Sequence, residues 1–334
     1  MSCDICDSNA LNSLGRIQGY RQNSYYDIIE CKTCGTSSAS PRAVDGKIYD
    51  AIYKNVDKVP GYARYCSLAK QILRERDALG YIAKVEESYY AVCKTLVEKV
   101  ADRAQTTICE VGCGQGYLTY ALVKAGFKAT GVDISQKAVD LARTRYGDYY
   151  FCGNLKDFVE RNLHRPQYVV ATELIEHLTD PVSFVSEMLE FVSPGGSLVV
   201  TTPNKLSSAG PIWDTELPPV HLWWFTKKGL TEIARKVDCE INFVDLTEFY
   251  KMNVKFGLVD DAVSIQKMPV LDDNYNLIQA RPDEALSASI KRRLKNVLPN
   301  SLVRKMQEIR AANRHLHIID DEHSRALCAT YTKK

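Results

Sequence analysis

The sequence predicts an α/β fold built on a mostly parallel sheet, and two observations support this prediction. Between residues 105 and 249 of the 334-residue chain, short apolar runs alternate with amphipathic helical stretches. This alternation is typical of βαβ units, in which helices cover both faces of a parallel sheet. The first run, 106–111, enters a turn with glycine at every second position, at Gly112, Gly114 and Gly116. Ligands of such sheets bind at the carboxyl ends of the strands, so this turn is the first candidate site.

The N-terminal 40 residues contain two Cys-x-x-Cys pairs separated by short β-like runs. Four thiolates in two such pairs are typical of a structural zinc site, and the metal would stabilise a segment too short to fold by burial of apolar surface. We therefore expect a zinc ribbon over 1–40, with a redox pair or metal-free cysteines as alternatives. Four protein ligands leave no open coordination position, so we expect no catalysis by this zinc. The expected ligands are Cys3, Cys6, Cys31 and Cys34.

Residues 41–104 are predicted to form a helical connector with helical stretches at 61–78 and 84–103. The connector is rich in tyrosine. Either it packs on the main domain, or tyrosines such as Tyr62 and Tyr65 cover the ligand at the glycine turn.

The core is predicted to end at residue 249, and a mostly helical basic insertion at 250–322 is expected before a final strand at 323–334. Residues 288–314 contain eight Lys or Arg residues against the single acid Glu308. They form either a solvated helix face or a surface for an anionic substrate or a membrane face. The final strand should pair beside strand 240–247. The other predicted core strands are 106–111, 128–133, 149–152, 168–172 and 196–202, and the predicted core helices are 116–126, 136–146, 154–162, 181–192 and 226–237.

Composition excludes several classes of protein. The net charge of +2 does not indicate a general nucleic-acid binder. The chain has eleven cysteines, an odd number spread through predicted core elements, which argues against a secreted disulfide framework. No apolar run approaches the roughly 20 residues of a membrane span, and no leader-like segment precedes the first cysteines. We expect a cytoplasmic protein with no membrane span, although peripheral membrane association stays open.

The glycine turn is one of several motifs that occur in a fixed order. Glu110 stands two residues before Gly112, a spacing that differs from the dinucleotide pattern Gly-x-Gly-x-x-Gly. Asp133 ends the second strand, and a Cys-Gly-Asn-Leu segment follows the third. A Glu-x-x-Glu-His segment then follows the fourth strand, and Pro-Gly-Gly precedes the fifth. Together these motifs resemble the class I S-adenosylmethionine-dependent methyltransferases, over about 85–249 and 324–332.

The resemblance implies S-adenosylmethionine as cofactor and assigns roles to individual residues. Asp133 would accept hydrogen bonds from both ribose hydroxyls, because a carboxylate offers two acceptor atoms. Ile134 would pack on adenine, and Thr172 would lie beside the cofactor. Asn154 matches the adenine-edge position, where the family more often has Asp. The glycine turn would hold the methionine part, so the remaining implied cofactor-binding residues are Glu110, Gly112, Gly114, Gln115, Gly116 and Leu155.

Two histidines are candidate catalytic residues. The segment from Thr172 to Pro181 resembles that of the ubiquinone-biosynthesis-like methyltransferases, and His177 in it is either a structural hydrogen-bonding residue or a base. The segment 218–226 resembles the His-containing loop of zinc-ribbon sugar methyltransferases, in which a histidine is the base; His221 matches it. Pro218 and Val220 replace the Tyr and Glu of that family's Tyr-x-Glu-His run. The departure disfavours C-methylation and leaves O-methylation open.

All three tryptophans, Trp213, Trp223 and Trp224, fall within the same region after the fifth strand. They form either an acceptor pocket or a hydrophobic lid. We therefore expect an enzyme that methylates a sugar hydroxyl by in-line transfer with a histidine base. The acceptor would be a small molecule or glycan, possibly phosphate-bearing. The alternatives are a zinc-ribbon RNA base methyltransferase, C- or N-methylation of another metabolite, and a non-catalytic cofactor-binding scaffold. Residues 1–50 contain more acidic than basic side chains, which disfavours RNA.

Overall fold

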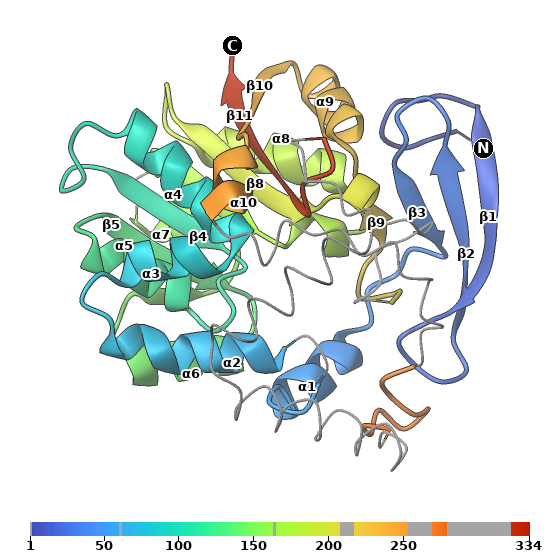
Figure 1. Cartoon of the computed structure of the whole chain (residues 1–334), viewed down its shortest axis with the longest axis horizontal. Helices are drawn as coiled ribbons and strands as arrows, with labels where there is room; N and C mark the ends of the chain where they lie inside the picture. Colours follow the sequence, from blue (N-terminus) through green and yellow to red (C-terminus); the bar gives the residue numbers. More distant parts are fainter. Residues whose placement is uncertain (1, 60–61, 163–164, 208–216, 253–268, 279–321) are drawn as a thin grey trace.

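The computed structural model describes residues 2–59, 62–162, 165–207, 217–252, 269–278 and 322–334. These residues form a large α/β unit with a small antiparallel sheet beside it (Figure 1). Three features of the sequence analysis lie outside the described residues: Trp213, the basic segment 288–314 and most of the predicted insertion at 250–322.

The large sheet contains every strand predicted for the core. Within the described residues it has seven strands in the order β10-β11-β8-β7-β4-β5-β6. The strand order reverses between β4 and β7, so the carboxyl ends of these two strands flank the place where ligands bind in open α/β sheets. The strands are β4 (Thr107–Val111), β5 (Lys128–Asp133), β6 (Tyr150–Cys152), β7 (Tyr168–Thr172), β8 (Ser197–Pro203), β10 (Cys239–Phe243) and β11 (Ala326–Lys333).

The last strand, β11, runs antiparallel between β8 and β10. The expected pairing beside the preceding strand is therefore confirmed, with Ile241 opposite Tyr331. The sheet is therefore mixed rather than wholly parallel. Parallel pairing with the preceding strand needs a crossover connection to the opposite end of the sheet, whereas a strand that starts at the end where that strand finished pairs antiparallel. The strand predicted at 240–247 ends earlier, at Phe243, and α10 (Thr247–Met252) begins where Asp245 accepts a hydrogen bond from the Thr247 amide.

Helices cover both faces of this sheet and create two hydrophobic cores. On one face Val92 of α4 (Glu87–Lys99) packs in the same cluster as Val199 of β8. On the other face Val185 of α8 packs in the same cluster as Val200, the next residue of β8. Successive strand residues point to opposite faces, so the apolar run of β8 supplies both cores. The core helices are α5 (Tyr117–Lys124), α6 (Gln136–Tyr146), α7 (Leu155–Asn162), α8 (Pro181–Phe191) and α9 (Lys227–Lys236).

The connector is helical, as predicted, but it is divided differently. Among the described residues it contains a helix that the sequence did not predict, α1, in which Ile48, Ala51 and Ile52 are buried at helical spacing. Asp77 accepts a hydrogen bond from the Gly80 amide and starts a separate short helix, so the predicted stretch 61–78 ends there. The connector helices are α1 (Gly46–Lys54), α2 (Ala63–Gln71), α3 (Ala78–Val85) and α4 (Glu87–Lys99).

The small sheet joins the N-terminal strands to a strand from the core. Its order is β1-β2-β3-β9, with antiparallel pairing throughout. The last of these strands is contributed by Trp223 and Trp224, which pair with Ser38 and Ser37. Both tryptophans are buried, with 3% and 2% of their surface exposed, so they join the two parts of the molecule and offer little surface to a ligand. The strands are β1 (Leu11–Gln18), β2 (Tyr25–Cys31), β3 (Ser37–Ser40) and β9 (Trp223–Trp224).

Polar contacts reinforce this junction. Lys205, in the short helix η3 (Lys205–Ser207) after β8, is buried, donates to the Gly35 carbonyl at 2.7 Å and pairs with Glu30. The Thr226 hydroxyl donates to the Cys34 carbonyl at 2.6 Å. Both contacts end at the second Cys-x-x-Cys turn, so the loops after β8 and β9 hold that turn in place.

Lys205→Met should destabilise the folded chain by about 1–3 kcal/mol, because the change leaves Glu30 and the part-buried Gly35 carbonyl without their charged partner. Urea unfolding would measure it. Lys236→Met is the matched control, since Lys236 pairs with the exposed Asp7 of the same N-terminal region and exposed pairs contribute about 0–1 kcal/mol. Equal effects of the two substitutions would contradict the role given to Lys205.

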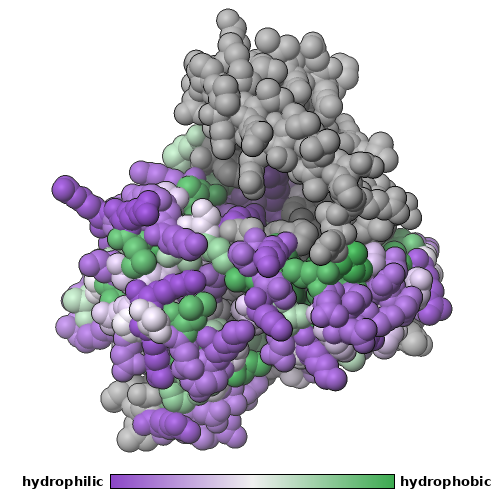
Figure 2. Space-filling model, turned by 90° about the horizontal axis from the view of Figure 1, so that it is seen from below, coloured by the Kyte–Doolittle hydropathy of each residue, from purple (hydrophilic) through white to green (hydrophobic). Residues whose placement is uncertain are grey.

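Among the described residues, no helix combines the length and apolar character needed to cross a bilayer. In the coloured part of the face in Figure 2, hydrophilic residues predominate and small hydrophobic patches lie between them.

Candidate active site

The glycine turn after β4 leaves part of the main chain open to a ligand. Gly112, Gly114 and Gly116 all have positive φ, at 72°, 49° and 79°. A Cβ on Gly116 would lie 2.6 Å from the Tyr150 ring, so glycine is required there for packing. A Cβ on Gly114 would meet only the Tyr53 hydroxyl, at 3.9 Å. The half-buried backbone at Gly114 therefore leaves room in front of the sheet, where a ligand can rest on it.

Asp133 lies next to this turn at the end of β5. Its carboxylate accepts hydrogen bonds from the Gly114 amide at 2.9 Å and from the Ser135 amide at 2.8 Å. Burial raises the pKa of Asp133, and these two amides partly offset the effect. The next residue, Ile134, is 83% exposed beside it. A fixed carboxylate and an exposed apolar side chain at adjacent positions suit a ribose and an adenine ring, so these residues fit the implied cofactor.

Glu110 faces away from this opening. Its carboxylate is buried and accepts hydrogen bonds from the amide of Thr119, at 2.8 Å, and from the hydroxyl of Thr119 in α5. Burial raises the pKa of Glu110 to about 7, and the contacts with Thr119 partly oppose the shift. In this position Glu110 fixes the start of α5 and thereby the shape of the glycine turn.

This raised pKa predicts a pH-dependent contribution to stability. Between pH 4.5 and pH 7 the folded chain holds a proton on Glu110 that the unfolded chain releases, so stability falls as the pH rises through this window. Glu110→Gln removes the ionisation and keeps an acceptor for Thr119. The variant should gain up to roughly 3 kcal/mol relative to wild type between pH 5 and pH 8, measured by urea unfolding. A difference that stays constant with pH would contradict it.

Gln115 and Thr172 lie at the carboxyl edge of the sheet. The side-chain carbonyl of Gln115 accepts a hydrogen bond from the Arg145 side chain at 3.0 Å, and this contact ties the turn to α6. Thr172 is half-buried at the end of β7 and lies in register with Thr201 of β8. Both residues therefore lie at the edge where the ligand is expected.

The two residues after β6 have local structural roles. The Asn154 side-chain carbonyl accepts a hydrogen bond from the Asp157 amide at 2.8 Å and caps α7. Leu155 is 1% exposed and packs in the hydrophobic core. A contact between Leu155 and a cofactor would therefore come from its backbone.

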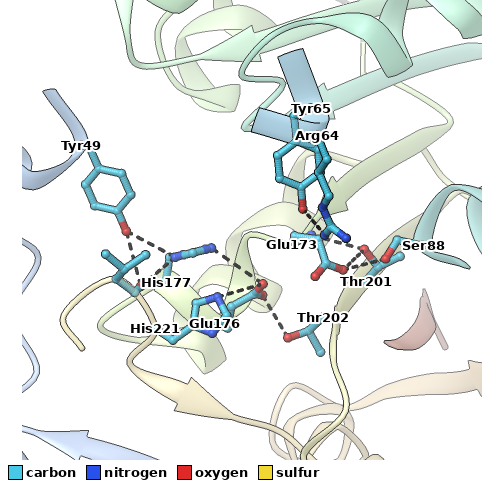
Figure 3. Close-up of polar contacts among 11 residues, drawn as sticks. Tyr49, Arg64, Tyr65, Ser88, Glu173, Glu176, His177, Thr201, Thr202 and His221 are labelled. Carbon is cyan, nitrogen blue, oxygen red and sulfur yellow. Dashed lines mark hydrogen bonds and ion pairs between the residues drawn. The ribbon is translucent and has the colours of Figure 1, made fainter. Parts of the chain in front are cut away.

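A buried polar cluster lies beyond the ends of β7 and β8 and contains both candidate catalytic histidines (Figure 3). Glu176 Oε1 lies 3.7 Å from His177 Nε2 and 4.0 Å from His221 Nε2, and the two imidazole rings are 4.8 Å apart. Glu176 is 1% exposed, and its second oxygen accepts a hydrogen bond from the Thr202 hydroxyl at 2.9 Å. The structure thus brings together histidines that are 44 positions apart in the sequence.

The backbone of the His221 loop sets the protonation of His177. His177 Nδ1 donates to the Val220 carbonyl at 2.7 Å, which leaves Nε2 as the acceptor in the neutral ring. Burial lowers the pKa of His177 to about 4, although the carbonyl contact favours the charged form. His177 is therefore neutral at pH 7. Tyr49 of α1 also donates to the Val220 carbonyl, at 3.5 Å.

This cluster can move a proton or hold a metal ion. The ligand atoms of Glu176, His177 and His221 all lie within 4.8 Å of one another. Imidazole and carboxylate ligands suit zinc and other first-row transition metals, and neutral imidazole is the form that binds them. The same neutral imidazoles are potential general bases.

Glu173 begins a second polar group, which the sequence reasoning missed. It has φ of 50°, uncommon for a residue other than glycine, and its carboxylate accepts hydrogen bonds from Ser88 at 2.8 Å and Thr201 at 3.0 Å. Arg64, which pairs with Glu86 at 3.6 Å, lies beside it (Figure 3). Glu173 opens the Glu-x-x-Glu-His segment, so its position could have been found from the sequence. Its partners come from distant elements and gave no local signal.

The four N-terminal cysteines form a single cluster. The Sγ atoms of Cys3 and Cys34 are 3.9 Å apart, and those of Cys6 and Cys31 are 3.5 Å apart. All four sulfurs lie within 4.8 Å of one another. Tetrahedral zinc with bonds of about 2.3 Å separates its sulfurs by about 3.8 Å, so this geometry fits the ion.

Comparisons with known proteins show similarity to methyltransferases over part of the chain. Residues 83–242 match a family described as a methyltransferase domain. The chain is 31% identical to a "Probable S-adenosylmethionine-dependent methyltransferase" of Mycolicibacterium smegmatis, over 47% of this chain and 61% of the relative. It is 29% identical to the ubiquinone biosynthesis O-methyltransferase of Aromatoleum aromaticum, over 33% of this chain and 49% of the relative. The chain thus spans about half the length of the curated relatives it matches.

Among solved structures, the chain is similar to the CcbJ methyltransferase from Streptomyces caelestis. The TM-score is 0.41 at 13% identity, over 72% of this chain and 93% of that chain. The sheet order, the glycine turn with Asp133 and the family match lead to one conclusion. Residues 83–242 resemble a class I S-adenosylmethionine-dependent methyltransferase domain in sequence and in sheet order.

Proposed function

We propose that this chain transfers a methyl group from S-adenosylmethionine to a hydroxyl of a sugar, either nucleotide-linked or part of a surface polysaccharide. The observation that supports transfer to oxygen is the buried cluster of His221, His177 and Glu176. An alcohol needs a base that removes its proton as the oxygen attacks the methyl group. The sugar as acceptor rests on the resemblance of the His221 loop to that of zinc-ribbon sugar methyltransferases. The N-terminal sheet and that loop are joined through β9, so the two features form one unit.

The cofactor supplies an activated methyl group when bound. The Gly114 backbone and the carboxylate of Asp133 would hold it, with Ile134 against the adenine. His221 would accept the acceptor's proton at Nε2, and Glu176, held by Thr202, would stabilise the imidazolium. The low pKa of His177 makes it a weak base, so its role would be to orient the acceptor and maintain the cluster. Orientation of the acceptor in line with the transferred methyl group would supply much of the rate enhancement.

We also propose that Cys3, Cys6, Cys31 and Cys34 hold a structural zinc ion in a ribbon over 1–40. The sulfur separations support this assignment. The zinc would fix the second cysteine turn, to which Lys205 and Thr226 are bonded.

Asp133→Ala should weaken binding of S-adenosylhomocysteine at least about tenfold, because a carboxylate that bonds two ribose hydroxyls makes charge-assisted contacts of about 1.5–3 kcal/mol. Isothermal titration calorimetry would measure the dissociation constant. Asp148→Ala is the control, since Asp148 has a side chain that is 87% exposed. An unchanged constant for Asp133→Ala would contradict the proposed cofactor site.

A second candidate acceptor is an aromatic hydroxyl. It is favoured by the matches to ubiquinone biosynthesis O-methyltransferases, including that of Coxiella burnetii at 31% identity over 29% of this chain and 44% of the relative. Incubation of the protein with methyl-labelled S-adenosylmethionine and parallel sets of nucleotide sugars and catechols would separate the two. Label in the catechol set only would replace the sugar proposal.

A further inference from the structure

Helix α1 lies below the two sheets in the view of Figure 1, and it packs against the loop that carries His221. Ile48 and Ile52 are buried, and they pack in one cluster with Leu217 and Val220 of that loop and with Tyr20 of the N-terminal region. One face of α1 is therefore fixed to the segment that carries His221. The helix begins where the Asp45 carboxylate accepts a hydrogen bond from the Lys47 amide.

Another face of α1 presents two tyrosines toward the active site. Tyr49 and Tyr53 are four residues apart, so they lie one turn apart on the same side of the helix. The Tyr53 hydroxyl lies 3.9 Å from the point that a Cβ on Gly114 would occupy. Burial raises the pKa of Tyr53, and the nearby carboxylate of Asp133 adds to the shift. Tyr53 thus lies over the open part of the glycine turn.

Tyr49 reaches the second half of the site. Its hydroxyl donates to the Val220 carbonyl at 3.5 Å and lies 3.3 Å from His177 Nδ1 (Figure 3). The same carbonyl accepts the Nδ1 proton of His177. Tyr49 and His177 therefore share one acceptor, and a change at Tyr49 alters the contact that fixes the tautomer of His177.

We propose that α1 is part of the active site, with Tyr53 as a contact to the cofactor at Gly114 and Tyr49 as a positioning residue for His177. The proposal rests on the proposed function, because it takes S-adenosylmethionine as the ligand of the glycine turn. It assigns the cover of the cofactor to Tyr53, one helix earlier than Tyr62 and Tyr65, which the sequence offered as one of two alternatives. In the structure those two tyrosines pack edge to face against each other, and Tyr65 accepts a hydrogen bond from Arg64 at 2.7 Å. A single helix would then contact both the methyl donor and the proton-transfer cluster.

Titration of S-adenosylhomocysteine into purified full-length variants tests the first half. Tyr53→Ala should weaken binding at least about tenfold and Tyr53→Phe about two- to fivefold, because the ring supplies contact area and the hydroxyl a single hydrogen bond. Tyr25→Ala, at a side chain that is 49% exposed on the N-terminal sheet, should bind as wild type does. Wild-type affinity in a folded Tyr53→Ala variant would overturn the cofactor contact. Failure of the wild-type chain to bind would refute the proposed function instead.

Nitrogen-15 spectra of histidine-labelled protein test the second half. Tyr49→Phe should shift the ring resonances of His177 and leave those of the exposed His323 unchanged. Affinity for S-adenosylhomocysteine should stay within about twofold of wild type. His177→Asn identifies the signals by their loss. Unshifted His177 resonances in Tyr49→Phe would overturn the positioning role, because a purely structural tyrosine has no effect on the tautomer.

Discussion

His221→Ala is expected to lower kcat by about 10²–10⁴, the range that a positioned general base contributes, while affinity for S-adenosylhomocysteine stays within about twofold. The physical reason is that His221 lies beside Glu176, which can stabilise the imidazolium, whereas burial holds the pKa of His177 near 4. Steady-state rates with the acceptor found in the labelling screen would measure kcat. His323→Ala is the matched control, because His323 is exposed.

His221 is buried, so its loss could also affect folding. His221→Asn keeps a polar side chain beside Glu176 and removes the basic imidazole, and urea unfolding of both variants separates stability from turnover. A folded His221→Asn protein with wild-type kcat would exclude His221 as the base. A large loss in His177→Asn with little loss in His221→Asn would transfer the role to His177.

The α/β fold was predictable because local patterns determine it. The core strands contain apolar runs, and several core helices begin at a recognisable signal, such as Ser135 before α6 or Asp180 and Pro181 at α8. Asp133 and the glycine turn were predictable for the same reason, since both directly follow buried strands. The antiparallel direction of β11 was not predicted, because it depends on which edge of the sheet the chain reaches after a long excursion.

The candidate site was predictable only in part. His177 and His221 were each identified from local motifs, but nothing in either motif places them on the same carboxylate. Glu110 and Leu155 occupy motif positions, yet their side chains face the protein interior. Trp223 is buried in a strand that pairs with the N-terminal sheet. Long-range pairing and burial decide these outcomes, and they are not encoded in short-range spacing.

Removal of the proposed zinc should affect the active site as well as the N-terminal segment. The cysteine turn at Cys31–Cys34 precedes β3, and β3 pairs with β9, two residues after His221. Structural zinc in small finger peptides contributes about 10–16 kcal/mol of folding free energy, so loss of the ion should release β3 from β9. Trp223 and Trp224 would then become solvated, and the fluorescence of the chain should shift to longer wavelength on chelation.

Cys31→Ser should produce the same shift without chelator and reduce the metal content from about one zinc per chain to near zero. Both measurements use a Trp213→Phe background, so that only the two tryptophans of β9 report. Cys152→Ser is the control, since Cys152 lies at the end of β6, outside the four-cysteine cluster. Zinc-free protein that keeps buried tryptophans and full stability would refute the metal site. A spectral shift together with loss of turnover but retained affinity for S-adenosylhomocysteine would show that the ribbon supports the acceptor half of the site and leaves the cofactor half independent.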